Sequence, residues 1–157
     1  LEAGLNAAVS FPGVFKPLDT LTVGAQVRWD VLGAHEGMVV EPQVTYAAPL
    51  GKAFVLQLQT GLEFVDDNFA DYYFSVTPSQ RADSGLPAFT AEGGLNRIGT
   101  LAILNYDLSG NALDGGWSFY GVGGYSRLLG DAADTPFTSV RGSPNQFITG
   151  LGVGYTF

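Results

Sequence analysis

The single histidine of this chain is the first residue to consider for catalysis. His35 is followed by Glu36 in a polar stretch, and a histidine beside a serine could activate that serine as a nucleophile. Ser10 and Ser126 have no motif context such as Gly-x-Ser-x-Gly. We therefore interpret His35 as a structural loop residue, and the sequence predicts a protein that is not an enzyme.

A second possible chemistry is the binding of divalent cations by loop carboxylates. Ca²⁺ takes oxygen ligands, and the same side chains could meet the divalent ions that bridge lipopolysaccharide. Their spacing matches no calcium-binding loop, so we interpret them as solvated acids and predict no metal or cofactor. These carboxylates are Asp66, Asp67, Asp71, Asp131 and Asp134.

Other polar residues recur at every second position of segments that are otherwise apolar. A period of two is typical of β-strands. Six segments alternate in this way: 1–11, 20–31, 39–48, 53–64, 98–108 and 147–157. Residues 117–128 are a seventh predicted strand, whose facing is ambiguous because glycines occupy both parities. The polar face of the alternating segments would line the lumen of a barrel, either as a water-filled passage or as a hydrogen-bonded core. The predicted lumen-facing residues are Arg28, Asp30, Glu41, Gln57, Gln59, Glu63 and Asp107.

Charge parity supports a membrane barrel. In the clearly alternating segments every charged side chain lies opposite the apolar set. An arginine facing lipid costs about 2–4 kcal/mol at the bilayer midplane, so such parity should be strict. A soluble sandwich or lipocalin-like sheet would show the same parity, but not so continuous an apolar face. We predict an all-β fold, an antiparallel transmembrane β-barrel of the bacterial outer membrane with about seven strands in this single domain, residues 1–157.

Composition agrees with this class. Charged residues make up only 14% of the 157 residues, against about 25% in soluble domains. There is no apolar run of the length that a membrane-spanning helix needs, and no cysteine for a disulfide. The net charge of −8 argues against nucleic acid as a partner.

Connection lengths and the last strand predict an orientation. The connections at 49–53 and 109–116 are short, as periplasmic turns are, whereas those at about 65–97 and 129–145 are long, as extracellular loops are. Residues 147–157 end in an aromatic-rich strand. We predict that Tyr155 and Phe157 form the C-terminal signal for the barrel assembly machinery.

The long loops carry two conspicuous groups. Tyr72, Tyr73 and Phe74 are too aromatic for a solvated loop, so they either plug the lumen or pack on the aromatic girdle. The second group is a set of four charged residues in or beside the second long loop: Arg127, Asp131, Asp134 and Arg141. These residues either form a salt-bridged network that orders the loop or line a pore mouth.

Motifs in these loops carry a family resemblance. The segment Phe-Ala-Asp-Tyr-Tyr-Phe-Ser-Val-Thr-Pro-Ser-Gln at 69–80 and the segment Gly-Tyr-Ser-Arg-Leu-Leu-Gly-Asp-Ala-Ala-Asp-Thr-Pro at 124–136 are the longest of them. With Arg-Gly-Ser-Pro-Asn-Gln-Phe at 141–147 and the Tyr-Thr-Phe ending, they resemble the MipA/OmpV family of outer-membrane proteins (MltA-interacting protein). The family's mature chain is longer. We expect this chain to be the C-terminal two thirds of a barrel of about 10–12 strands.

The resemblance implies a role and partners. It implies a non-enzymatic scaffold that links a murein hydrolase and a murein synthase, surrounded by outer-membrane lipid and lipopolysaccharide. Two alternatives stay open. The polar lumen face suits a porin-like channel for small solutes, and the long loops suit a surface adhesin or ligand-binding barrel.

Overall fold

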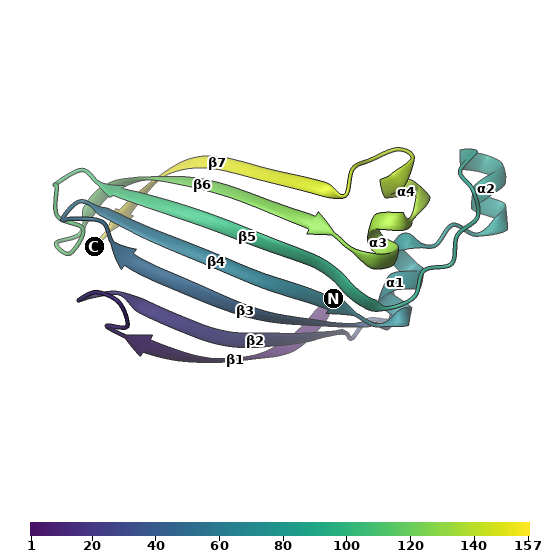
Figure 1. The fold of residues 1–157 in the computed structure, drawn as a ribbon, viewed down its shortest axis with the longest axis horizontal. Coiled ribbons are helices and arrows are strands. Elements are labelled where there is room, and N and C mark those ends of the chain that lie inside the picture. Colours follow the sequence, from purple (N-terminus) through teal and green to yellow (C-terminus); the bar gives the residue numbers. More distant parts are fainter.

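The computed structural model describes all of residues 1–157 as one curved antiparallel sheet with four short helices at one end (Figure 1). Each strand pairs with the next in chain order. The strands are β1 (Glu2–Pro12), β2 (Thr20–Asp30), β3 (Met38–Pro49), β4 (Phe54–Val65), β5 (Gly94–Asp107), β6 (Gly116–Leu128) and β7 (Asn145–Thr156). This order confirms the predicted all-β antiparallel fold with seven strands.

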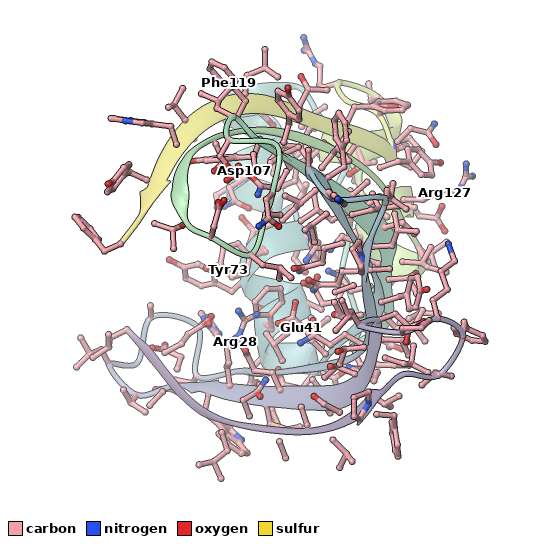
Figure 2. The ribbon with its side chains drawn as sticks, turned by 90° about the vertical axis from the view of Figure 1, so that its left-hand side faces the viewer. Arg28, Glu41, Tyr73, Asp107, Phe119 and Arg127 are labelled. Atoms are coloured by element: carbon pink, nitrogen blue, oxygen red, sulfur yellow. The ribbon has the colours of Figure 1, made fainter.

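The sheet curls around a hollow, as the wall of a barrel does (Figure 2). β1 and β7 form its two edges and do not pair with each other. Arg28, Glu41 and Asp107 lie on the side of the hollow, whereas Phe119 lies on the outer side. The polar face predicted from alternation is therefore the concave face of the sheet.

The outer face is apolar and exposed. Leu5 in β1 is 74% exposed and Leu151 in β7 is 94% exposed. A bilayer would cover such a face, because outward positions of a membrane barrel contact lipid. None of the helices is long and apolar enough to cross a membrane.

The sequence of β6 is rich in glycine and does not show which of its side chains face outward. Cross-strand pairs place Trp117 opposite Tyr155 and Tyr125 opposite Phe147, so these rings share the outer face. Tyr120 has the opposite parity, and its ring lies over Gly152, where an added Cβ would be 2.3 Å from the ring. The glycine thus makes room for an aromatic ring on the inner face.

The two longest connections, residues 66–93 and 129–144, lie at the same end of the sheet. The short turns, residues 13–19, 50–53 and 108–115, lie at the end that holds the C-terminus, which we call the short-turn end (Figure 1). Residues 31–37, 66–93 and 129–144 connect strands at the opposite, long-loop end. That end carries all the helices: α1 (Asp67–Phe74), α2 (Pro78–Ser84), α3 (Gly130–Asp134) and α4 (Pro136–Ser139).

Two of these helices carry start signals in what was predicted as an irregular loop. The Asp66 side chain accepts from the Phe69 N–H at 3.0 Å and caps α1. Thr77 and Gln80 form a reciprocal capping box at the start of α2, which ends on Gly85 at φ 71°. These are ordinary helix boundary signals, but both helices are too short to show a periodic apolar face.

β5 begins at Gly94, earlier than the alternation predicted. The register shifts there, because Glu63 pairs with Arg97 while Phe64 pairs with Leu95. Asn96 is the extra residue of this β-bulge, which lets two successive residues oppose one on the neighbouring strand. The bulge breaks the period of two, so alternation cannot be followed back to Gly94, and β5 extends into the stretch of about 65–97 that was predicted as a long loop.

The turn between β1 and β2 is organised by one carboxylate. Asp19 is only 1% exposed. It accepts from the backbone N–H groups of Val14, Phe15 and Lys16 at 2.7–3.0 Å and from the Tyr46 hydroxyl at 2.9 Å. Burial alone would raise the pKa of Asp19, but these four hydrogen bonds together hold it below its ordinary value.

Asp19→Asn is expected to destabilise the folded protein near neutral pH, because an amide has a single acceptor oxygen for four donors. Since the folded-state pKa of Asp19 is lowered, the carboxylate contributes fully above about pH 4. Its contribution is lost as pH falls through the lowered pKa. Unfolding of both proteins across this range checks the prediction, and a difference that persists undiminished in acid would contradict it.

Candidate functional site in the hollow of the sheet

A chain of ion pairs crosses the inner face of β1 to β5. Arg28 contacts Glu2 at 3.4 Å and Glu41 at 3.0 Å. Arg97 contacts Glu41 at 3.7 Å and also pairs with Glu63. Each arginine therefore contacts two carboxylates, and Arg97 reaches from β5 to the two acids on the adjacent strands β3 and β4. We call these five residues the ion-pair ladder.

The bulge in β5 completes the ladder. Glu63 lies directly opposite Arg97 in the register. Asn96, the extra residue, donates to the other carboxylate oxygen of Glu63 at 2.6 Å. The Glu63 side chain is 12% exposed and both of its oxygens are used, so this end of the ladder is the most constrained.

Three of the seven predicted lumen residues, Arg28, Glu41 and Glu63, belong to the ladder. Sequence reasoning did not single out Arg97 or Asn96, because the bulge hid the strand that carries them. Glu2 was on the predicted polar face, but only the pairing of β1 with β2 brings it to Arg28.

The other four predicted lumen residues lie outside the ladder. Gln59 donates to Gln43 at 2.5 Å, and Gln57 pairs in register with Ile103 on the same face. Asp30 and Asp107 end their strands and hold the following turns. Asp30 accepts from the N–H groups of Leu32, His35 and Glu36, and Asp107 accepts from Ser109.

His35 is 8% exposed and fully engaged. Its Nδ1 accepts from the Gly37 N–H at 3.1 Å, so Nε2 of the neutral ring carries the proton toward Glu2 at 3.2 Å. The rings of Phe69 and Tyr73 lie 5.1 and 5.5 Å from the imidazole. His35 therefore joins α1 to the ladder through Glu2.

α1 packs over the mouth of the hollow. Phe69 and Phe74 pack on a buried cluster of Val39, Val65, Ala70 and Ala91, and Tyr73 points into the hollow in Figure 2. The Thr135 hydroxyl, from the other long loop, donates to the Phe74 carbonyl at 2.6 Å. Phe69, Tyr73 and Phe74 thus pack inward rather than on the outer girdle, whereas Tyr72 is 58% exposed and has its ring 6.0 Å from that of His35.

The predicted salt-bridged network of the second long loop is not formed. Arg127 points away from the hollow (Figure 2) and donates to the Asn145 side chain at 3.3 Å. Asp131 accepts from the Glu92 N–H at 2.7 Å. Asp134 and Arg141 form no ion pair. Arg127 has outward parity in β6, which separates it from the acids of α3.

The loop carboxylates do not converge on a common point. Asp66 caps α1, and Asp67 accepts from the Gly93 N–H at 2.7 Å. No group of three or more His, Cys, Asp or Glu side chains is arranged to hold a metal ion. Asp66, Asp67 and Asp131 instead accept from backbone N–H groups of the first long loop, residues 66–93.

A cavity of about 710 Å³ lies beside the ladder on the inner face. Its polar lining includes Glu41, Gln43, Gln59, Glu63, Arg97 and Ser126. These side chains offer both hydrogen-bond donors and acceptors, with charges of both signs.

A curved antiparallel wall with an apolar outer face, a polar ion-paired inner face and long loops at one end is typical of a β-barrel protein of the outer-membrane type. The family model described as MltA-interacting protein MipA matches residues 1–157. The chain belongs to this family and is a protein of the bacterial outer membrane.

Two curated relatives share this assignment to the outer membrane. The chain is 28% identical over 130 residues to "Putative outer membrane protein YiaT" of Escherichia coli (strain K12), and the same values hold for the protein of that name from Escherichia coli O157:H7. The match covers 83% of this chain and 50% of each relative. The chain thus spans about half the length of the curated relatives it matches. No solved structure matches it.

Proposed function

We propose that this protein is a non-enzymatic outer-membrane barrel that holds a murein hydrolase, together with a murein synthase, at the periplasmic face of the membrane. The family description, MltA-interacting protein, supports a protein partner, and the family resemblance implies that this partner is a murein hydrolase. The structural observation that carries the non-enzymatic part of the proposal is the ladder, whose charged side chains pair with one another across the inner face.

The surroundings of His35 support a role without catalysis. Both ring nitrogens are used, one by the Gly37 N–H and the other by Glu2. The nearest partners of the imidazole ring are aromatic side chains and not a hydroxyl nucleophile. A general base needs a free nitrogen within reach of a nucleophile, and this histidine has none.

The short-turn end suits a docking platform. Its third turn is ordered, because Asp107 accepts from the Ser109 N–H at 2.8 Å and the Ser109 hydroxyl donates to Asp114 at 2.8 Å. A partner that binds ordered turns loses less conformational entropy than one that must order flexible loops. Under this proposal the short turns face the periplasm, and β7, with Tyr155 and Phe157, is the element that the barrel assembly machinery recognises.

Affinity capture with the full-length protein in nanodiscs tests the scaffold role. Capture of a purified murein hydrolase is expected to fall at least about tenfold when residues 109–114 are replaced by a Gly-Ser linker, a loss of about 1.4 kcal/mol. The same replacement of residues 78–84, which form the exposed α2 at the opposite end, serves as the control and should leave capture unchanged. If the unaltered protein captures no hydrolase, the scaffold role is lost.

A channel for small polar solutes is the second candidate, favoured by the polar cavity beside the ladder. Planar-bilayer recording of the full-length protein distinguishes the two. Discrete conductance steps that change when Arg97 is replaced by glutamine would support a passage along the ladder, whereas a silent bilayer would exclude it.

A further inference from the structure

We propose that the first two short turns form a binding site for anionic phospholipid at the membrane surface of the short-turn end. The turns are residues 13–19, between β1 and β2, and residues 50–53, between β3 and β4. Each combines a lysine with exposed apolar neighbours. We call Lys16 and Lys52 with Phe15, Leu18 and Leu50 the lysine rim.

The two lysines of the chain, Lys16 and Lys52, both lie in these turns, although the protein carries a net charge of −8. Neither forms an ion pair with the protein. Both carboxylate oxygens of the nearby Asp19 already accept hydrogen bonds from backbone N–H groups or from the Tyr46 hydroxyl. The ammonium groups are therefore left for an external anion, and lysine binds phosphate as a compact point charge.

The apolar neighbours are exposed in positions that lipid could cover. Phe15 is 70% exposed, Leu18 is 73% exposed and Leu50 is 43% exposed. A long cationic side chain next to such groups is typical of a membrane interface, where the charge reaches the headgroups and the apolar part lies at the acyl boundary.

The first turn is continuous with the lipid-facing surface. The Phe15 ring packs edge-on against Tyr46, with centroids 5.6 Å apart. Tyr46 pairs with Leu21 and Leu58 in the register, so it belongs to the apolar outer face. The turn therefore contacts the outer face that the bilayer covers. This position favours lipid over a soluble protein as the ligand of the lysine rim.

The turn is also held in one shape. The Asp19 carboxylate accepts hydrogen bonds from the N–H groups of residues 14–16. Leu18 adopts φ 70°, a left-handed backbone conformation that residues other than glycine seldom take. Such conformations persist where the surroundings enforce them, often at binding sites. In this turn the strained residue is Leu18, whose side chain is 73% exposed close to Lys16 in the chain.

Phosphatidylglycerol enrichment tests the charge component. The full-length protein is placed in mixed vesicles of phosphatidylcholine and phosphatidylglycerol, and the lipid that remains after detergent extraction is quantified. Lys16→Gln with Lys52→Gln should lower the preference for phosphatidylglycerol by about fivefold per lysine. Arg81→Gln, in the exposed α2 at the other end, is the matched control. An unchanged preference in the double variant overturns the proposal.

Tryptophan quenching tests the position of the turn. Phe15→Trp is made in a background in which Trp29 and Trp117 are replaced by phenylalanine, and folding is verified by heat-modifiable migration. Phospholipids brominated near the headgroup should quench residue 15. Leu113→Trp is the control, because Leu113 is 81% exposed in the third short turn, which has no lysine. Absent quenching at position 15, or equal quenching at both positions, overturns the proposal. Protection of position 15 only when a soluble periplasmic protein is added would show a protein site instead.

Discussion

Glu63→Ala is expected to lower the free energy of unfolding by about 2–3 kcal/mol, because it removes a carboxylate that serves two charged or polar partners. Asn96 would lose its acceptor, and Arg97 would retain only the longer contact to Glu41 at 3.7 Å. The largest part of the cost comes from leaving a half-buried guanidinium incompletely paired. Urea unfolding of the protein in lipid vesicles, followed by tryptophan fluorescence, measures the change.

Two further variants locate the origin of this effect. Asp83→Ala removes an exposed acid from α2 and should change stability by less than about 0.5 kcal/mol. Glu63→Leu combined with Arg97→Met replaces the charged pair by apolar side chains and should recover much of the lost stability, because no unpaired charge remains. If Glu63→Ala unfolds at the same urea concentration as the unaltered protein, the ladder does not brace the wall.

Gly93→Ala is expected to destabilise the protein by about 1–3 kcal/mol and to loosen α1 from the mouth of the hollow. An added Cβ at this position would lie 2.5 Å from the Asp66 carbonyl carbon and 2.6 Å from the Val65 carbonyl oxygen. Both are backbone atoms at the junction of β4 and α1, so they cannot move aside as the tip of a side chain can. The start of β5 must therefore separate from α1.

Hydrogen exchange and limited proteolysis check this loosening. Residues 67–74 should exchange faster and the 66–93 connection should be cleaved sooner in Gly93→Ala than in the unaltered protein. Gly123→Ala is the matched control, since an added Cβ there meets no atom within 4 Å. Unchanged protection of α1 in Gly93→Ala would show that the contact between β5 and α1 does not hold the helix.

The strands and the faces they present could be predicted from local pattern. A period of two shows which side chains share a face, whatever the neighbouring strand is. Asp30 and Asp107 could be assigned to the predicted polar face because their parity is a property of β2 and β5 alone. The helices α1 and α2 were missed, although Asp66 and Thr77 are recognisable caps, because each is too short for periodicity to emerge.

The functional contacts depended on pairing that local pattern does not contain. His35 and Glu2 are far apart in the chain, and they meet because the pairing of β1 with β2 brings Glu2 opposite Asp30. Arg97 and Asn96 reach Glu63 only because one extra residue interrupts β5. An insertion of this kind reverses the side-chain parity on one side of it, so alternation read along the sequence fails at the bulge.

The sequence by itself determined the class of this protein, because a lipid-facing apolar surface and a polar interior are imposed by solvent on every strand separately. It also determined which connections are long and which are short. Only the tertiary structure decided which charges pair across the hollow and that α1 packs inward over them. These outcomes depend on strand register, on the bulge at Asn96 and on the docking of two distant loops, each of which is set by contacts between residues remote in sequence.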